Sequence, residues 1–324
     1  MFRRVFLGAL GATAALPWSA RAQGFPDRPV KVVVPFAPGN TLDTALRQVA
    51  EEFRRNTGQA LVIDNRPGGG GAVAANVVTG SPPDGYTILL SSTTLFAINP
   101  HTYPRLTYDP ESFKPVGGFL GASLAMAINA ANVPANNLRE FVAWAKGKPP
   151  GSVSYASFTP GGAAHFTGVI LNRQAGMDML HVPFNGTPPA VQALLGGQVH
   201  AALLPPLAVK PHVDSGRVKV IAISSPQRSP LMPNVATFTE QGFPELEIYI
   251  WSGLSVPGAT PDAAIARLNT EFNKVLASAE IREKWRALDF EPLPMSPAQF
   301  RAYVASDNKR WAEAVKLSGF KATE

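Results

Sequence analysis

The chain has 324 residues, with 29 Lys and Arg against 23 Asp and Glu, and it contains no cysteine. The lack of cysteine excludes disulfides, thiolate metal sites and cysteine catalysis. The basic residues are scattered without any Lys/Arg run, so the charge pattern gives little support for nucleic-acid binding.

The first 22 residues have the pattern of a secretory signal peptide. Arg3 and Arg4 precede an apolar stretch that ends in the small-residue exit Ala20-Arg21-Ala22. We expect cleavage before Gln23, and both the general secretory and the twin-arginine export routes fit this pattern. The mature chain is therefore expected outside the cytoplasm, with 26 basic residues left once the three arginines of the signal are removed.

The segment from Val30 to Phe53 is the most informative part of the chain. An apolar β-branched run is stopped by Pro35, Pro38 and Gly39, and residue types that cap helices follow before apolar residues recur at helical spacing. Such a turn presents free backbone N–H groups at the positive end of a helix dipole, which can bind an anion without a charged side chain. Because the turn holds no Ser, Cys, Lys or His, it predicts a carboxylate receptor and not an enzyme.

The rest of the chain continues the alternation of strands and helices. In the first half we predict strands at 60–64 and 86–90 with a helix at 72–78, and the chain leaves the first domain within 113–130. A second round follows, with helices at 138–146, 163–173 and 188–195 and strands at 152–157, 179–183, 199–204 and 218–224. A return strand at 247–256 and amphipathic helices at 261–278 and from Pro297 complete the chain.

This order predicts an α/β protein of two lobes, each a mostly parallel sheet flanked by helices, with two crossovers between them. Domain 1 is expected to comprise residues 23–123 and 247–324, and domain 2 residues 124–246. A small molecule is expected to bind in the cleft between the lobes, at the carboxyl ends of the strands.

Seven segments, in this order, carry a family resemblance: VVPFAPGNTLD, DNRPGGGG, PPDGYTILL, AINPHTYP, SYASFTPGGAAHF, HVPFNGTPPAVQALLGGQV and VPGATP. Together they resemble the substrate-binding proteins of tripartite tricarboxylate transporters, the Bug family, over nearly the whole mature chain. The resemblance implies a type II periplasmic-binding-protein fold and a monomer in the periplasm, without a cofactor. It also implies a small organic acid as ligand and the integral membrane subunits of the transporter as partners.

The resemblance further implies two ligand loops, 36–43 and 157–165, that hold carboxylates through backbone amides, hydroxyls and waters. Both loops depart from the family pattern, since Leu42 and Ala163 stand at hydroxyl positions and Phe158 replaces a small residue. Acids common in the family are also missing at His200 and Leu204, so a more apolar acid, aromatic or long and aliphatic, is expected. The candidate ligand-binding residues are Phe36, Ala37, Pro38, Gly39, Asn40, Thr41, Leu42, Asp43, Thr93, Ser157, Phe158, Thr159, Gly161, Gly162, Ala163, His165, Phe184 and Leu204.

Several of these residues also have a structural interpretation. Asp43 is expected to cap its own helix, because an acid beside a bound carboxylate would repel it. His165, near a helix start, is expected to be a neutral hydrogen-bonding residue and not a general base. The run Gly68–Gly71 lacks the remainder of a nucleotide-binding motif, and the five histidines lack zinc-ligand spacing, so no phosphate or metal site is predicted.

Two other functions compete with a transport receptor. An exported hydrolase would need a G-x-S-x-G elbow or an acid/base pair, and the sequence has no such elbow. A sensory protein that presents its ligand to a membrane receptor kinase would have the same sequence features, and this alternative stays open.

Overall fold

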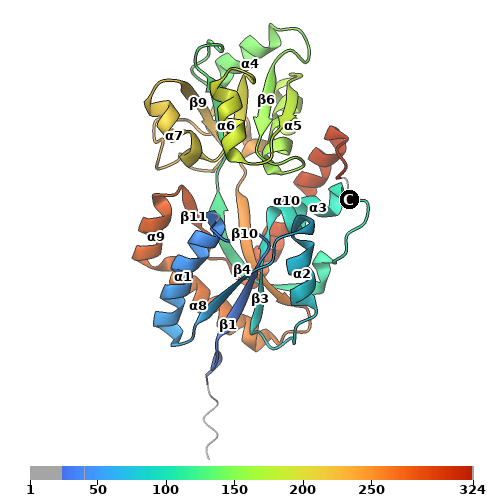
Figure 1. The fold of residues 1–324 in the computed structure, drawn as a ribbon, viewed down its shortest axis with the longest axis vertical. Helices are drawn as coiled ribbons and strands as arrows, with labels where there is room; N and C mark the ends of the chain where they lie inside the picture. Colours follow the sequence, from blue (N-terminus) through green and yellow to red (C-terminus); the bar gives the residue numbers. More distant parts are fainter. Residues whose placement is uncertain (1–23, 40, 323–324) are drawn as a thin grey trace, which may run out of the picture.

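The protein consists of two lobes, one above the other in Figure 1, joined by extended segments. The computed structural model describes residues 24–39 and 41–322, so the predicted signal peptide lies outside the described residues. Lobe 1 is built on a six-stranded sheet of order β11-β4-β10-β3-β1-β2, and lobe 2 on a five-stranded sheet of order β7-β6-β8-β5-β9. The predicted two-lobed α/β architecture is confirmed.

The strands of each sheet run mostly in one direction. The strands of lobe 1 are β1 (Val30–Val34), β2 (Leu61–Asn65), β3 (Thr87–Ser92), β4 (Phe113–Ala122), β10 (Ile250–Pro257) and β11 (Phe290–Pro292). Those of lobe 2 are β5 (Ala125–Asn129), β6 (Ser154–Ser157), β7 (Leu180–Pro183), β8 (Ala201–Leu204) and β9 (Val218–Ile223). The pairings make β10, β11 and β5 antiparallel to the rest, so the mostly parallel sheets are as predicted.

Helices cover both faces of both sheets. In lobe 1 they are α1 (Thr41–Thr57), α2 (Ala72–Thr79), α3 (Asn99–Thr102), α8 (Asp262–Ala277), α9 (Ala279–Arg286) and α10 (Pro297–Ser318), with the short turns η1 (Gly69–Gly71), η2 (Thr94–Ile98) and η3 (Pro110–Ser112). In lobe 2 they are α4 (Leu138–Lys146), α5 (Ala163–Ala175), α6 (Thr187–Leu195) and α7 (Pro206–Asp214), with η4 (Thr239–Gln241) and η5 (Pro244–Leu246). Helices α3, α7 and α9 and strands β4, β5 and β11 are not among the elements predicted from the sequence.

The three consecutive valines 32–34 of strand β1 are buried on both faces of the sheet, whereas Lys31 near the start of the strand is exposed. Val32 and Val34 join a buried cluster with Phe53 of α1 and Phe272 of α8, whereas Val33 joins the cluster on the opposite face with Ala74 of α2. Successive residues of a strand point to opposite faces, so a sheet covered on both sides needs apolar residues at every position.

The apolar segment 113–130 is divided between the two lobes at the first crossover. Strand β4 ends at Ala122 in lobe 1, and β5 begins at Ala125 in lobe 2, with Ser123 and Leu124 between them. The chain returns through β10, and the two strands that enter from the other lobe, β5 and β10, run against most of their neighbours. The exact domain boundaries given above remain a prediction.

The two lobes repeat one arrangement. Strands β2, β1, β3, β10 and β4 follow one another in the first sheet as β7, β6, β8, β5 and β9 do in the second. Strand β1 therefore corresponds to β6, and each is followed by a turn into a helix. Three such turns per lobe, after β1, β2 and β3 and after β6, β7 and β8, end on the carboxyl edges of the two sheets.

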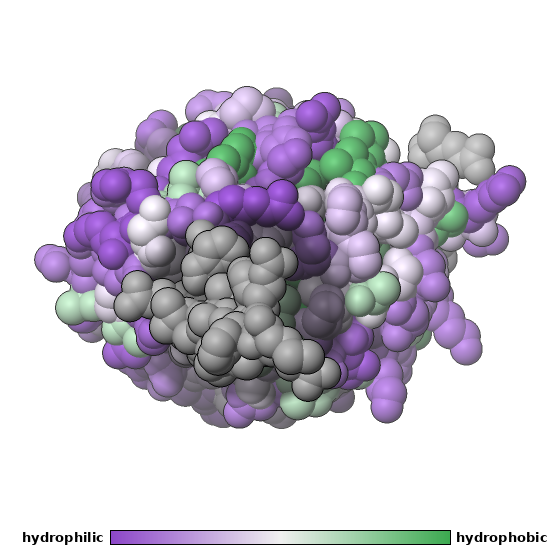
Figure 2. Space-filling view, turned by 90° about the horizontal axis from the view of Figure 1, so that it is seen from below, coloured by the Kyte–Doolittle hydropathy of each residue, from purple (hydrophilic) through white to green (hydrophobic). Residues whose placement is uncertain are grey.

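The far end of lobe 1 is predominantly polar. Figure 2, a view from below, shows a mostly hydrophilic surface with small separate hydrophobic patches where the described residues are visible. Within residues 24–39 and 41–322, no helix has both the length and the apolar composition that crossing a bilayer requires.

Candidate functional site

A cavity of about 680 Å³ lies where the strand-to-helix turns of the two lobes meet. The turns of lobe 1 contribute Pro35, Phe36, Leu42, Gly68, Gly70, Gly71, Ser92, Thr94 and Leu95, and those of lobe 2 contribute Phe158, Thr159, Gly162, Ala163, Ala164, Thr187, Pro205, Leu207 and Ala208. The crossovers and the segment before β11 supply Ala122, Ser123, Leu124, Ile250, Trp251, Ser252, Leu288 and Phe290. All six turns reach the cavity because parallel strands end at the same edge of each sheet. None of these described lining residues carries a charged side chain.

The structure places six of the predicted ligand-binding residues in the cavity wall: Phe36, Leu42, Phe158, Thr159, Gly162 and Ala163. Ten others do not line it: Ala37, Pro38, Gly39, Asp43, Thr93, Ser157, Gly161, His165, Phe184 and Leu204. Asn40 lies outside the described residues, and Thr41 begins α1, but its side chain is not among the described ones.

Asp43 is engaged within lobe 1. Its carboxylate is 1% exposed and accepts hydrogen bonds from the Gly39 amide at 2.9 Å, from Arg47 at 2.9 Å and from the Asn65 side chain at 3.1 Å. Burial acts to raise the pKa of Asp43, but these hydrogen bonds outweigh it and hold the pKa below its usual value. These contacts support the helix-capping interpretation, because Asp43 orders the turn that enters α1.

Thr93 and Leu204 have structural roles. The Thr93 hydroxyl donates to the Trp251 carbonyl at 3.2 Å and accepts from the Trp251 amide at 2.8 Å, which ties β3 to the crossover strand β10. Leu204 is fully buried in the core of lobe 2. The missing family acid at position 204 therefore does not place an apolar side chain in the cavity wall.

The N-terminus of α5 is the strongest anion-binding feature of the cavity. Its N-cap is Gly162, which has no side chain to accept a hydrogen bond, and the first intrahelical bond is donated by the Phe166 amide to the Gly162 carbonyl. The amides of Ala163, Ala164 and His165 thus have no intrahelical acceptor. Since Gly162, Ala163 and Ala164 line the cavity, the positive end of α5 faces it.

Capping differs between helices that point into the cavity and those that do not. Four helices whose first turns reach the wall, α2, α5, α6 and α7, have Gly71, Gly162, Gly186 and Pro205 as N-caps without a side-chain hydrogen bond. Away from the cavity, α4, α9 and α10 are capped by the side chains of Asn137, Ser278 and Ser296. Helix α8 is an exception, being uncapped with Asp262 in its first turn. The end of α5 is the strongest of the four as a donor site, because the first turns of α6 and α7 contain prolines that lack an N–H, and the Ala208 and Ala72 amides bond backbone carbonyls.

Ser157 and two histidines form a cluster beneath the second ligand loop. The Ser157 Oγ lies 2.8 Å from His181 Nε2 and donates to the Thr159 carbonyl at 3.2 Å, and the His165 and His181 rings stack at 3.7 Å. Burial lowers the pKa of His165 to about 4, and burial together with the His165 neighbour lowers the pKa of His181 to about 3. Both imidazoles are therefore neutral at pH 7. The Nδ1 atom of His165 is buried without a partner, so the hydrogen bond expected of this ring is not seen at that atom.

This serine–histidine contact is not a catalytic pair. Ser157 is fully buried and does not line the cavity, so its hydroxyl cannot reach a bound molecule. The hydroxyl also lies within hydrogen-bond distance of the Thr159 carbonyl, so its contacts serve the local structure of the loop. The geometry favours a binding site over a hydrolase.

The comparisons with known proteins agree with this geometry. Residues 45–320 match the family model described as the tripartite tricarboxylate transporter family receptor. The chain belongs to this receptor family. The curated Protein BugT of Bordetella pertussis is 32% identical over 97% of this chain and 97% of its own length.

Two solved structures of the same fold carry named acids. A Rhodopseudomonas palustris protein solved with adipate is 28% identical, with a TM-score of 0.77 over 92% of this chain and 99% of its own. MatC from Rhodopseudomonas palustris with bound malate is 30% identical, with a TM-score of 0.71 over 90% of this chain and 100% of its own. The predicted family and the periplasmic-binding-protein fold are confirmed.

Twenty of the 26 residues that line the cavity of this family receptor are not among the residues predicted from the sequence. The turns after β2, β3, β7 and β8 could have been predicted as parts of the site. Each follows a parallel strand, and the carboxyl ends of parallel strands lie at the same edge of a sheet. Leu288 and Phe290 carry no comparable signal. They reach the cavity only because the segment after α9 folds back against β4.

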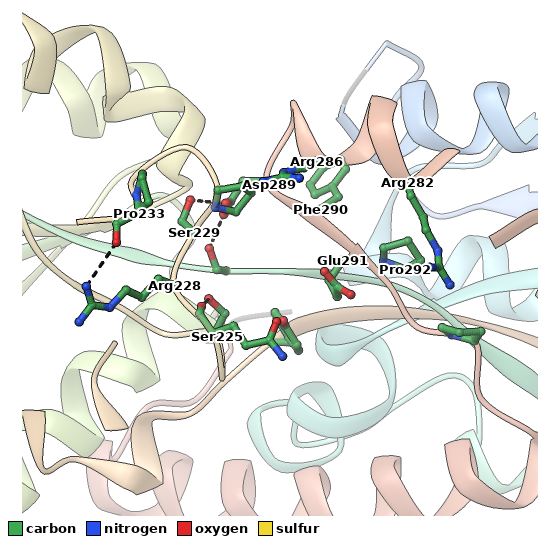
Figure 3. A pocket seen from close by; sticks show the side chains of 15 residues that line it. Ser225, Arg228, Ser229, Pro233, Arg282, Arg286, Asp289, Phe290, Glu291 and Pro292 are labelled. Carbon is green, nitrogen blue, oxygen red and sulfur yellow. Dashed lines mark hydrogen bonds between the residues drawn. The ribbon is translucent and has the colours of Figure 1, made fainter. Parts of the chain in front are cut away.

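A second cavity of the receptor, about 570 Å³, lies beyond Ser123 and Phe290, which line both cavities. Figure 3 shows Asp289 facing Ser229 from the opposite lobe and Glu291 on the same wall as Pro292. Arg228, Arg282 and Arg286 line this cavity beside the two acids, so its wall carries charges of both signs, and burial raises the pKa of Asp289 and Glu291. The first cavity is the candidate ligand site because it lies at the carboxyl ends of the strands of both lobes.

Proposed function

We propose that the protein is a periplasmic receptor that binds a small organic carboxylate with an apolar or aromatic body in the interlobe cavity. It delivers this acid to the integral membrane subunits of a tripartite tricarboxylate transporter. The observation that carries the proposal is the combination of unpaired amides at the start of α5 with a wall free of charged side chains.

The electrostatics of the cavity support an anion that is released again. The helix ends stabilise negative charge by about 0.3–1 kcal/mol each, and up to about 2 kcal/mol in a partly buried setting. A buried guanidinium clamp would hold a carboxylate more tightly and leave an unpaired charge on release. The uncapped helix ends of both lobes allow one acid group to be bound on each side as the lobes close around it.

The apolar part of the wall supports a hydrocarbon body between the acid groups. Large apolar side chains come from both lobes, with Leu42 and Leu95 on one side, Phe158 and Leu207 on the other, and Phe290 beside the crossovers. Burying apolar ligand surface here contributes roughly 25 cal/mol per Å². The relatives solved with adipate and malate support a carboxylate, and this wall favours the less polar type of acid.

The location and assembly follow from the same proposal. Residues 1–22 act as the export signal, residues 23–123 with 247–324 and residues 124–246 fold as the two domains, and the receptor works as a monomer.

A thermal-shift screen of the mature protein, unfolded and refolded to remove carried ligand, tests the proposal. The panel holds di- and tricarboxylates, amino acids, long aliphatic acids, and aromatic acids such as terephthalate and nicotinate. An acid at 1,000 times its Kd adds about 4 kcal/mol to the free energy of unfolding, which is a clear rise in Tm. We expect the largest rise with aromatic or long aliphatic acids.

The outcomes separate the parts of the proposal. A rise with small polar acids alone would contradict the apolar specificity but keep the carboxylate site. No rise with any carboxylate, in a protein that refolds fully, would overturn the proposed function.

A further inference from the structure

The C-terminal end of the chain crosses from lobe 1 to the second ligand loop. Helix α10 starts on lobe 1, where the Phe300 ring lies against Gly253 of β10, and its last turns lie beside α5 of lobe 2 (Figure 1). The tail beyond α10 is fixed again to lobe 1, because the Ala322 amide donates to the Thr102 carbonyl at 2.9 Å. The segment between these anchors is thus held by lobe 1 while it touches lobe 2.

Phe320 is the side chain that makes this contact. A Cβ on Gly161 would lie 2.3 Å from Phe320 Cε1, so the ring lies directly on the glycine backbone. The ring also meets His165 edge-on at 5.5 Å and Phe166 at 6.0 Å. Gly161 has φ +65°, a conformation that other residues rarely adopt. A side chain at this position would also occupy the space of the Phe320 ring.

Phe320 contacts the turn that precedes α5, whose first amides lie at the cavity. Gly161 directly precedes the N-cap Gly162, and His165 contributes the last of the three unpaired amides of α5. Phe320 itself does not line the cavity. It can therefore influence a bound acid only through the position of this turn.

We propose that Phe320 is a positioning residue that holds the amide donors of α5 at a fixed place relative to lobe 1. This inference rests on the proposed function, because it assigns ligand binding to the start of α5. A ligand held between two lobes needs the hydrogen-bond donors of both lobes at fixed positions relative to each other. A side chain that is anchored on lobe 1 and supports the turn of lobe 2 fixes that relative position.

The variant Phe320→Ala tests the proposal, with Phe320→Leu as the conservative variant. Leu317→Ala, at a 50% exposed side chain in the last turn of the same helix, is the matched control. Isothermal titration with adipate and with terephthalate as probes should show Kd raised roughly tenfold in Phe320→Ala, largely restored in Phe320→Leu and unchanged in Leu317→Ala. An equal Kd for Phe320→Ala and Leu317→Ala would overturn the proposal.

Hydrogen exchange of the unliganded protein gives a readout that needs no probe. The amides of Gly162 and Phe166 donate to the carbonyls of Thr159 and Gly162, so they report on the order of the turn. They should exchange faster in Phe320→Ala than in Leu317→Ala, and equal protection would also overturn the proposal. If neither acid binds the unsubstituted protein, the thermal-shift panel decides the proposed function, and the exchange data decide separately whether Phe320 holds the turn.

Discussion

Gly162 is the residue at which binding and helix stability can be separated. Its φ of −94° and ψ of 176° are ordinary for an N-cap, so a side chain is excluded neither by the backbone nor by a buried neighbour. A Cβ there would lie 3.1 Å from the Cβ of Thr159, an exposed residue that can shift by a few tenths of an ångström. The glycine leaves amides unsatisfied that a capping side chain would occupy.

We predict that Gly162→Asp abolishes most of the affinity for a carboxylate without loss of stability. The new carboxylate accepts the α5 amides and repels the ligand, so Kd should rise on the order of 10- to 100-fold, while Tm stays within a few degrees. Titration and thermal unfolding measure the two effects. Gly162→Asn, which caps without charge, should have the smaller effect on Kd, and an unchanged Kd in Gly162→Asp would move the anion site away from α5.

The stacked histidines predict an acid-sensitive fold. The pKa values of His165 and His181 are lowered to about 4 and about 3, so below the unfolded value of about 6.5 the unfolded chain binds more protons than the folded one. Their contribution to stability is present above pH 6.5 and is lost progressively as the pH falls toward 4 and 3. Tm should therefore decrease across this range.

His165→Phe should reduce the loss of Tm between pH 6.5 and 4, because it keeps a stacked ring and removes a group that takes up a proton more readily when the chain unfolds. His101→Gln, at a histidine outside the stack, serves as the control. Thermal unfolding at several pH values decides the matter, and identical pH profiles for both variants would refute the assignment.

At the scale of elements, the sequence predicts the parts of the fold that local chemistry determines. The turn from β1 into α1 was predicted because Pro38 and Gly39 stop a strand and an N-terminal helix pattern follows at once. The repeat of this unit from β6 into α5 was predicted for the same reason, and the two turns are the two predicted ligand loops. Helix α7 was missed because it starts with Pro205-Pro206 and contains Pro211, which argue against a helix in a local reading.

The side-chain directions of the candidate site could not be predicted from the sequence. Ser157 and Phe158 are neighbours at the end of β6, yet Ser157 is buried under the loop while Phe158 lines the cavity. Because side chains alternate along a strand, these two are expected to point in opposite directions. The packing of His181 against Ser157 decides which of them faces the cavity. The uncapped helix ends are likewise visible only once the cavity is known.

At the scale of the whole molecule, two contacts besides the crossovers tie the lobes together. One is the α10 tail, reinforced by the ion pair of Arg173 in α5 with Glu313 of α10. The other is Asp289 of lobe 1, which accepts hydrogen bonds from Ser123 at the crossover, at 2.5 Å, and from Ser229 on the side of lobe 2 (Figure 3). A relative rotation of the lobes must change the distance between Asp289 and Ser229.

We predict that Asp289→Ala widens the distribution of distances between the lobes. The change leaves the hydroxyls of Ser123 and Ser229 buried without their acceptor, at a cost of about 1–3 kcal/mol, and removes the only described side-chain bridge of this kind at the hinge. Since the chain has no cysteine, spin labels can be placed selectively at Asn56→Cys in α1 and Gln192→Cys in α6, both exposed. Pulsed dipolar spectroscopy then measures the distribution directly.

Asp289→Asn is the matched variant, because asparagine tolerates the φ of +60° found here and its amide can still bond both hydroxyls. It should keep a narrow distribution. It should also lose less stability than Asp289→Ala, since it keeps hydrogen-bonding atoms beside both buried hydroxyls. Equal widths for all three proteins would mean that the crossovers and the α10 tail alone fix the lobe orientation, and that Asp289 serves only the local turn before β11.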